Sequence, residues 1–311
     1  MAVSPSVVGS LLPPRRWRML AITLAWGACF LAIRWGLRDA PLLWFAALRA
    51  LIAGAALLAL GAYQRRPNPR SRGDWLLIGA LGLVNVTIGF AAMFAGTVGL
   101  VTGAAAVLAN AQPLLIVLPA WWLYGERIGP RTATALLIAF GGLFLVAAPG
   151  RGGSGALLSL VAAAAITAGT LLARKLKNLD VILASGWHFV IGGVVLAIAA
   201  AIVEGSPRID WSWRFVVALL FLSLVGSAFA FVLWFLETQR SPLAQLTSWT
   251  FLAPVFGVLL GFVVLGERPS VWMFGGLILV LVGLVLAQTG THTTGGSVPA
   301  SIAEGVSPAQ Q

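Results

Sequence analysis

Long runs of apolar residues alternate with short polar or glycine- and proline-containing breaks along most of this chain. Each run can form a helix of roughly 20 residues, the length needed to cross about 30 Å of hydrocarbon. Backbone groups find no water partners in lipid, so runs of this kind are expected to be helical. The pattern therefore predicts an all-α polytopic membrane protein with ten transmembrane helices. Their expected ranges are 17–37, 41–63, 75–95, 97–123, 130–149, 154–174, 180–203, 214–237, 242–265 and 270–289.

The chain also resembles itself when it is shifted by 141 residues. Each copy would contain five spans, and because five is odd the second copy must enter the bilayer upside down. Inverted repeats of this kind are typical of secondary transporters. The sequence thus predicts two inverted five-helix repeats. The matched positions include Phe90 with Phe231, Phe94 with Phe235, Pro113 with Pro254, and Gly125-Glu126-Arg127 with Gly266-Glu267-Arg268.

Charge predicts the orientation of these spans. Most lysines and arginines outside the spans fall in loops that share a side with both termini, and such loops are usually cytoplasmic. Residues after about 290 are rich in small and polar types without periodicity, which is typical of a disordered tail. The expected organisation is a cytoplasmic N-terminal segment (1–16), a first five-helix repeat (17–149), a second inverted repeat (150–289) and a disordered cytoplasmic tail (290–311).

Composition agrees with the membrane prediction. Hydrophobic residues make up 59% of the chain and charged residues 9%, whereas about a quarter of a soluble protein is charged. The net charge of +11 lies in short loops and not on one face of a folded domain, so we expect a lipid bilayer as partner and no nucleic acid. The single cysteine, Cys29, excludes an intramolecular disulfide.

Prolines interrupt two spans at matched positions. Pro113 lacks the N–H that would pair with the carbonyl of Ala109, and Pro254 does the same to Thr250. Transporters bind substrates near helix breaks of this kind at the middle of the membrane. We expect helix breaks at Pro113 and Pro254 that border a binding site, with simple packing kinks as the alternative.

Polar side chains surround the two prolines. An amide buried in hydrocarbon without a partner is costly, so these side chains must face one another or a wet cavity. We expect a substrate cavity, and the alternative is hydrogen bonding between helices. The candidate substrate-binding residues of this kind are Asn85, Asn110, Gln112, Gln245 and Ser248.

Three tryptophans, Trp26, Trp187 and Trp249, lie too deep in their predicted spans for the membrane interface. Deep indoles suit an aromatic or thioether substrate, or an amine held by cation–π contact. Core packing is the alternative, because tryptophan is first of all a large hydrophobic residue.

Two ionisable residues, Arg49 and His188, lie inside spans at matching positions of the two repeats. Helix-terminal carbonyls or a substrate carboxylate would satisfy Arg49. His188 is either a helix-contact residue or a substrate-binding group that titrates near neutral pH. No aspartate or glutamate lies deep in any span, although proton and sodium coupling usually need one. The sequence therefore predicts facilitated movement or exchange without carboxylate coupling.

These features together resemble the EamA family of the drug/metabolite transporter superfamily. The resemblance covers residues 17–289, and it implies an exporter of small metabolites in the cell inner membrane with a cavity open alternately to either side. Within that family the chain is most similar to YddG-type amino-acid exporters, which implies an amino acid or similar metabolite as substrate. The motifs that carry the resemblance are Trp26-Gly27, Arg49-Ala50-Leu51-Ile52-Ala53-Gly54, and the Pro-x12-Glu-Arg patterns Pro113–Arg127 and Pro254–Arg268.

Other classes of function fit less well. A multidrug efflux protein of the same superfamily would need an acidic residue in its first span, where this chain has Trp26 and Cys29. An intramembrane enzyme is not expected, because the sequence has two histidines and no His-Glu-x-x-His or Gly-x-Ser-x-Gly pattern. We therefore expect no catalytic residues, metal or cofactor. A structural or receptor protein stays open, and ten spans can enclose a cavity in a monomer.

Overall fold

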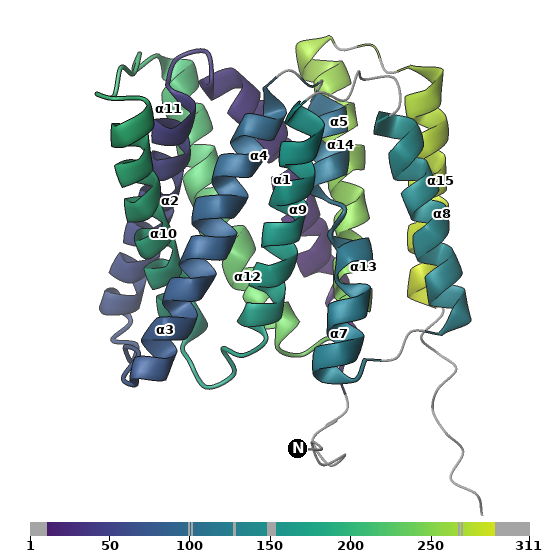
Figure 1. Cartoon of the computed structure of the whole chain (residues 1–311), viewed down its shortest axis with the longest axis horizontal. Coiled ribbons are helices and arrows are strands. Elements are labelled where there is room, and N and C mark those ends of the chain that lie inside the picture. The colour runs from purple at the N-terminus through teal and green to yellow at the C-terminus, as the bar shows by residue number, and fades with distance from the viewer. Residues whose placement is uncertain are drawn as a thin grey trace, which may run out of the picture.

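Helices run side by side across the full height of the molecule in a computed structural model of the chain (Figure 1). The structure describes residues 11–98, 100, 102–126, 129–147, 154–266, 268 and 270–289. The predicted tail 290–311, the first ten residues, and Arg127 and Glu267 of the paired Glu-Arg motifs lie outside the described residues. All regular elements among the described residues are helical, in agreement with the predicted fold class.

The helices follow the predicted spans closely, and several spans are built from shorter pieces. In chain order the elements are α1 (Arg16–Gly36), α2 (Leu42–Tyr63), α3 (Arg72–Leu81), the π-helical segment η2 (Gly82–Ile88), α4 (Gly89–Thr97), α5 (Thr102–Ala109), α6 (Gln112–Leu115), α7 (Val117–Tyr124) and α8 (Pro130–Ala147). The second half contains α9 (Ser154–Ala173), α10 (Val181–Val203), α11 (Trp213–Leu220), the π-helical segment η3 (Phe221–Phe229), α12 (Ala230–Thr238), α13 (Leu243–Ser248), the 3₁₀ segment η4 (Trp249–Phe251), α14 (Leu252–Leu265) and α15 (Val271–Thr289).

Eight helical stretches within the described part of the chain are long and apolar enough to cross a membrane. The other two predicted spans correspond to α8 and α15, and the apolar part of α15, Val271–Leu286, is shorter than the eight. The structure thus supports an all-helical protein with at least eight candidate spans, and the count of ten stays a prediction.

Capping residues set the points at which some helices begin. The span expected from residue 75 begins at Arg72, because Ser71 and Asp74 form a capping box with hydrogen bonds of 3.0 and 3.1 Å. Asp180 caps α10 by accepting from the N–H groups of Ile182 and Leu183. The cap at Ser71 adds three residues to the predicted third span, whereas α10 begins within one residue of the predicted start.

The third and eighth spans each contain a π-helical segment at positions that match in the sequence repeat. An i→i+5 turn holds one more residue than an α-turn, so the helix beyond it is rotated by about 100° relative to an uninterrupted α-helix. Phe90 in α4 and Phe231 in α12 each follow such a segment directly. The side chains of α4 and α12 therefore point in directions that the periodicity of an uninterrupted α-helix does not predict.

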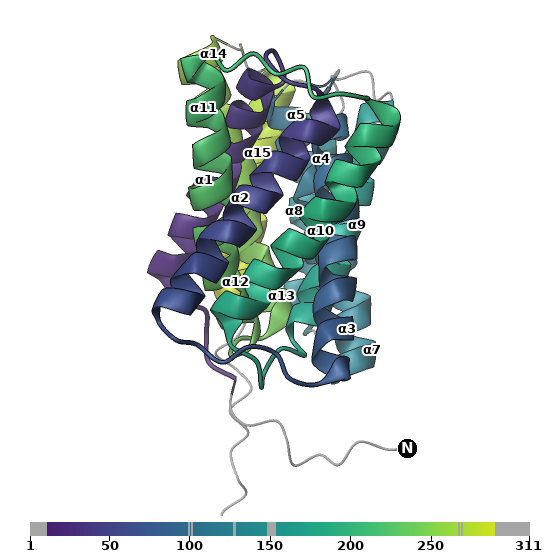
Figure 2. The ribbon, with the colours of Figure 1, turned by 90° about the vertical axis from the view of Figure 1, so that its left-hand side faces the viewer.

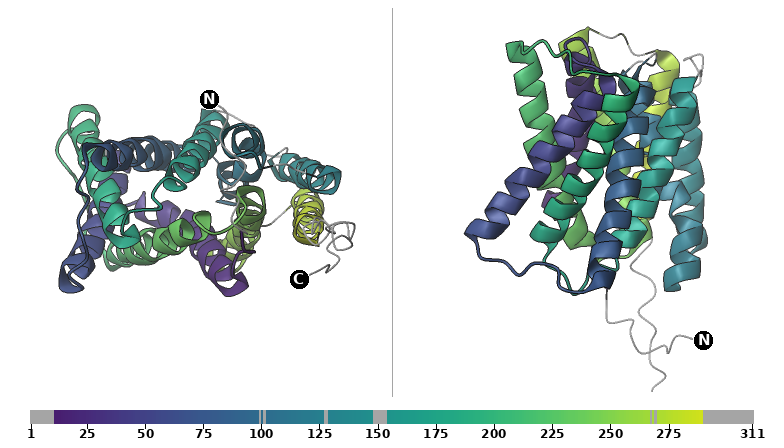
Figure 3. Two further views of the ribbon diagram at one scale, coloured as in Figure 1. Left: turned by 90° about the horizontal axis from the view of Figure 1, so that it is seen from below. Right: turned by 60° about the vertical axis from the view of Figure 1, so that its left-hand side comes forward.

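Helix pairs that come from different halves of the sequence form the body of the bundle. α2 packs along α10, and Figure 2 shows these two helices next to each other, with a similar slant, on the side that faces the viewer. α8 packs along α15 at the other side, where the view from below places them next to each other (Figure 3). α4 packs on α9, and α14 packs on α1. The two halves are thus interleaved and share one core.

Glycines bring α8 and α15 into backbone contact. A Cβ added to Gly142 would lie 2.5 Å from the carbonyl oxygen of Gly276, and one added to Gly283 would lie 2.6 Å from that of Ala135. Gly142 and Gly283 are matched in the sequence repeat, so the two contacts are equivalent. Small residues of this kind let membrane helices approach closely.

We expect Gly142→Leu and Gly283→Leu to destabilise the protein by similar amounts, about 1–3 kcal/mol each, because both force α8 away from α15. Thermal unfolding of the purified protein in detergent measures the effect. Gly141→Leu and Gly275→Leu are matched controls, since an added Cβ at either position meets nothing within 4 Å. A large loss of stability in one of the two variants Gly142→Leu and Gly283→Leu, with none in the other, would contradict the equivalence of the two helix contacts.

Candidate functional site

A small cavity lies between helices of both halves of the chain. Its free space is about 40 Å³. One water needs roughly 10–15 Å³, so this conformation accommodates a few waters and a metabolite would require the helices to move apart. The lining residues are Trp26, Cys29 and Phe30 of α1, Arg49 of α2, Phe90 and Met93 of α4, Ala109 of α5, Asn110, Gln112 of α6, Ile166 of α9 and Phe231 of α12.

Aromatic side chains form one wall of this central cavity. Trp26, at the middle of α1, packs against Trp234 with ring centroids 5.0 Å apart and against the edge of Phe231 at 5.7 Å. Phe90 contacts Phe231 at 6.2 Å, so the two repeat-matched phenylalanines meet. The rotation introduced by the π-helical segments brings both of them to the cavity.

A polar corner of the cavity lies at the helix break near Pro113. α5 ends at Ala109 and α6 begins at Gln112, so the backbone is not α-helical at Asn110 and Ala111. The side-chain amide of Asn110 donates to the carbonyl of Ala106 at 2.7 Å. At the matched place in the second half the helix narrows to the 3₁₀ turn η4, just before Pro254.

Thr170 of α9 joins the polar corner to the aromatic wall. Its hydroxyl oxygen accepts hydrogen bonds from Nε2 of Gln112 at 2.6 Å and from Nε1 of Trp234 at 3.1 Å. Thr170 is 2% exposed, so the two donors depend on this one acceptor in a site without solvent. One hydroxyl thus fixes side chains from α6 and α12 together.

Arg49 brings the only charged group among the cavity-lining residues of the described chain. Its Nε donates to Oγ of Ser227 at 2.8 Å, and its Nη2 lies 3.5 Å from the carbonyl oxygen of Gly226. Both partners belong to the π-helical segment η3. The guanidinium carbon also lies 4.2 Å from the ring centre of Phe90, which is cation–π distance. Arg49 therefore sits at the junction of α2, η3 and α4.

Three of the predicted substrate-binding residues, Trp26, Asn110 and Gln112, come together at the cavity. Gln245, Ser248 and Trp249 lie in α13 and η4 and are not among its lining residues. Ser248 donates to the carbonyl of Gln245 at 2.8 Å, and Nε1 of Trp249 has no hydrogen-bond partner among the described residues. Their role in binding stays a prediction.

The remaining predicted residues lie away from the cavity lining. Asn85 is buried in η2, where its side chain packs against Gly169 of α9. Trp187 packs against Trp75 near the beginning of α3, with Nε1 donating to Asn68 at 3.3 Å. His188 is fully buried against Phe189, Phe231 and Phe235, with its ring centre 4.2 Å from that of Phe189. Trp187 and His188 thus make packing contacts, whereas Oδ1 of Asn85 has no hydrogen-bond partner among the described residues. The role of all three residues in binding stays a prediction.

Apart from Arg49, seven lining residues are not among the predicted substrate-binding residues: Cys29, Phe30, Phe90, Met93, Ala109, Ile166 and Phe231. They are apolar or nearly so, and nothing in their local sequence separates them from other core residues. The repeat pairing of Phe90 with Phe231 was visible in the sequence, but the π-helical segments that turn them inward were not.

Ion pairs join several helices at the end of the bundle where α1 begins, called here the N-terminal end. Nη2 of Arg174 contacts Oε1 of Glu126 at 2.5 Å, and Nη1 donates to the carbonyls of Thr238 and Ser241. Glu126 also accepts from the first N–H of α13, that of Leu243, at 2.8 Å. Four spans are thereby tied together, since these groups lie beside the ends of α7, α9, α12 and α13.

A second ion pair cluster lies beside the first one. Glu237 of α12 is fully buried, and its carboxylate accepts from Arg18 at 2.8 Å and from Arg240 at 3.3 Å. The backbone N–H of Arg15 donates to the same carboxylate at 3.2 Å. The start of α1 is therefore anchored to α12 at the N-terminal end.

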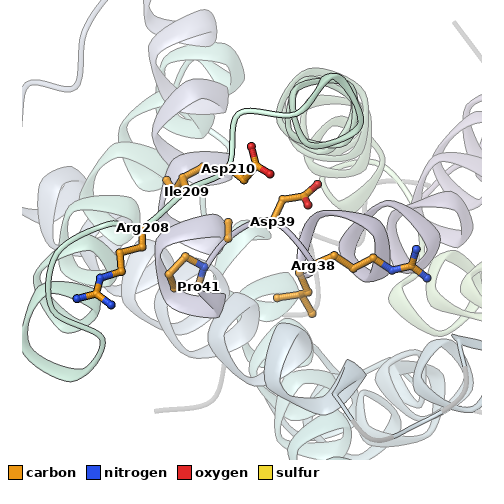
Figure 4. Close-up of a pocket in the computed structure, with 8 residues that line it drawn as sticks. Arg38, Asp39, Pro41, Arg208, Ile209 and Asp210 are labelled. Atoms are coloured by element: carbon orange, nitrogen blue, oxygen red, sulfur yellow. The ribbon is translucent and has the colours of Figure 1, made fainter.

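A wider hollow of about 500 Å³ opens at the opposite end of the molecule. It lies between the α1–α2 and α10–α11 loops, and Figure 4 shows Asp39 and Asp210 close together while Arg38 and Arg208 point away. The N–H of Asp210 donates to the carbonyl of Asp39 at 2.8 Å, so the loops are joined. The hollow shares no lining residue with the central cavity and is a surface feature.

Comparison with known families identifies the architecture that holds this cavity. A profile described as the EamA-like transporter family matches residues 17–148 and again 153–289. The chain belongs to the EamA-like transporter family. The resemblance inferred from the sequence is thereby confirmed at family level, and this EamA-like protein is a multi-pass membrane transporter.

Individual relatives agree with the family. The EamA-like chain is 32% identical over 278 residues to a WAT1-related chloroplastic protein of Arabidopsis thaliana, covering 85% of this chain and 66% of that protein. It is 29% identical over 294 residues to an uncharacterized transporter of Synechocystis sp., covering 86% of this chain and 88% of that protein. A solved crystal structure shares the fold with a TM-score of 0.72 at 20% identity, covering 88% of this chain and 96% of that chain.

Proposed function

We propose that this EamA-like protein is a secondary transporter that exports small metabolites, with neutral and aromatic amino acids as the first candidates. Substrate would bind at the central cavity, which opens alternately to the two sides of the cell inner membrane. The observation that carries the proposal is the lining of that cavity by aromatic and amide side chains from both halves of the chain. Sites of this composition suit small organic ligands.

Two inverted five-helix repeats with ten spans and cytoplasmic termini are part of the proposal. The π-helical segments at equivalent positions support it, as do Gly125 and Gly266, which end α7 and α14 with the same left-handed backbone at φ 66°. The helix contacts support it as well. The repeat relates α4 to α12 and α1 to α9, so the packing of α4 on α9 corresponds to the packing of the α11–α12 span on α1, and both contacts are present. We propose a monomer in the bilayer, since one chain encloses the cavity.

Facilitated movement or exchange is the proposed energetic mode. Proton- or sodium-coupled transporters usually carry a carboxylate within the membrane. None of the lining residues given by the structure is acidic, and the acids of the sequence lie at span ends, in loops or in the tail. The ion pairs of Glu126 and Glu237 join helices at the N-terminal end in this conformation, and we propose that export requires them to separate in each cycle.

Uptake into proteoliposomes tests the proposal. We expect saturable uptake of labelled phenylalanine, methionine or threonine that does not change with a pH gradient. Trp26→Ala should reduce the uptake about tenfold or more, because it removes the central aromatic surface of the cavity. Trp272→Ala is the matched control, since Trp272 is 64% exposed and is not one of the cavity-lining residues. No uptake of any amino acid would overturn the substrate proposal, and uptake driven by the gradient would overturn the uncoupled mode.

A further inference from the structure

Arg49 is a buried cation that the described protein does not neutralise. It is 2% exposed and lies two turns into the apolar helix α2, which begins at Leu42. A guanidinium group has five N–H donors and stays charged in proteins. Removing such a charge from water without a compensating anion is expensive. A residue of this kind inside a membrane therefore demands a partner.

The contacts of Arg49 give it partial hydrogen bonding but no countercharge. Ser227, Gly226 and the thiol of Cys29, whose Sγ lies 3.8 Å from Nη2, are all weak or neutral acceptors. Nη1 has no hydrogen-bond partner among the described residues. The two N–H groups of Nη1 are thus left over, in a side chain that lines the central cavity.

The sequence offers no acid that could supply the missing charge within the spans. Glu126 and Glu237 are paired with arginines at the N-terminal end, and Asp39 and Glu204 hold loops at the opposite end. The remaining cavity-lining groups are aromatic, aliphatic, thioether, thiol or amide side chains. The cavity therefore has one positive charge, aromatic walls and no negative charge.

We propose that Arg49 is the binding site for a carboxylate on the transported metabolite, and that the preferred substrates are organic monoanions with an apolar, preferably aromatic, body. The inference rests on the transporter function proposed above and names its substrate class. The two free N–H groups of Nη1 would bond the carboxylate oxygens, and charge-assisted bonds of this kind are stronger than neutral ones. The body of the substrate would pack on Trp26, Phe90 and Phe231.

This proposal separates substrates by charge. A zwitterionic amino acid brings an ammonium group for which the cavity has amide oxygens and aromatic faces but no carboxylate. A monoanion with the same body avoids the cost of burying that ammonium. We therefore expect hydrocinnamate to bind more tightly than phenylalanine, and phenethylamine to bind most weakly.

The first experiment uses the intact wild-type protein in detergent, with hydrocinnamate, phenylalanine and phenethylamine as matched ligands. Binding is measured by the rise in melting temperature at equal ligand concentrations, because the stabilisation of the folded state grows with the logarithm of the ligand's affinity. The affinity should fall in the order hydrocinnamate, phenylalanine, phenethylamine, with about a tenfold difference in affinity between the first and the last. An equal shift for all three, or the reverse order, would overturn the proposal.

The second experiment replaces the charge. Arg49→Met should lose the shift caused by hydrocinnamate, yet its own melting temperature should equal or exceed that of the wild type, because a hydrophobic side chain replaces an uncompensated buried charge. Arg49→Lys should retain weak binding. Arg214→Gln, at an exposed position of α11, removes one positive charge elsewhere and should leave the shift unchanged. A variant Arg49→Met that still binds hydrocinnamate would overturn the assignment.

Uptake by the same proteins distinguishes this inference from the transporter function. If hydrocinnamate binds at Arg49 but does not cross the liposome membrane, the binding site is supported and the transport proposal is overturned. If Arg49→Met takes up amino acids normally, the transport proposal is supported and the carboxylate site is overturned, because transport then proceeds without it.

Discussion

Replacing Arg174 with methionine is expected to lower the stability of the protein by about 3–5 kcal/mol, because the change leaves a largely buried carboxylate without its partner. Arg174 and Glu126 expose only 6% and 12% of their side chains, and the same guanidinium group bonds the carbonyls of Thr238 and Ser241. One substitution therefore removes three contacts that hold four spans together. Thermal unfolding in detergent measures the loss.

The exposed neighbour Lys175 provides the matched control for this change. Lys175→Met removes one positive charge next to the same helix end without breaking a described ion pair, and it should have little effect. A melting temperature for Arg174→Met within the range of that control would contradict the prediction. Such a result would mean that the ion pair contributes no net stability.

The loss caused by Arg174→Met should also depend on pH. Burial raises the pKa of the Glu126 carboxyl above its usual value of 4.5, while Arg174 and the N–H of Leu243 oppose the rise. Without Arg174 the folded state favours the protonated acid still more. A carboxyl with a raised pKa in the folded state stabilises the protein at low pH, and this stability is lost as the pH rises through the raised pKa. The deficit of the variant should therefore be smaller at pH 5 than at pH 8.

Thr170→Val is expected to have the second largest effect, although it changes the shape of the side chain very little. The hydroxyl of Thr170 is the acceptor for both Gln112 and Trp234, so valine leaves two buried donors without partners. Each unsatisfied donor costs about 1–3 kcal/mol. Uptake should fall as well, because Gln112 lines the central cavity and loses its fixed position.

Thr170→Ser is the control that separates the hydroxyl from the methyl group. Serine keeps the acceptor and removes one methyl, which costs about 1 kcal/mol in a packed site. The Thr170→Ser variant should therefore be clearly more stable to unfolding than the Thr170→Val variant. If the stability of Thr170→Val equals or exceeds that of Thr170→Ser, the two hydrogen bonds contribute nothing to stability, and the link between the helix break and Trp234 is not functional.

The sequence predicted the helices well, because apolar runs bounded by glycine, proline and charged loops leave few choices in a membrane. It also predicted that Trp26, Asn110 and Gln112 belong to one site, since a proline break creates polar backbone that must be satisfied. It did not predict Thr170. A threonine in a helix usually bonds its own turn, as Thr167 does to Ala163, so its sequence gives no sign of a longer-range partner.

The comparison of Arg49 with His188 shows where sequence reasoning stops. They occupy matched positions in the repeat, and each lies seven residues after the first residue of its helix, Leu42 in α2 and Val181 in α10. Only the structure shows that Arg49 faces the cavity while His188 is enclosed by Phe189, Phe231 and Phe235. The difference depends on which helix packs against each residue, and that information is not local in the sequence.

The two π-helical segments also make the inward position of Phe90 and Phe231 depend on one residue in each half of the chain. A π-turn holds one residue more than an α-turn. Removing one residue from η2 or from η3 would therefore turn the helix beyond it by about 100° and carry Phe90 or Phe231 away from the central cavity. The shape of the cavity is thus set in part by the number of residues in two helices, which no single side chain controls.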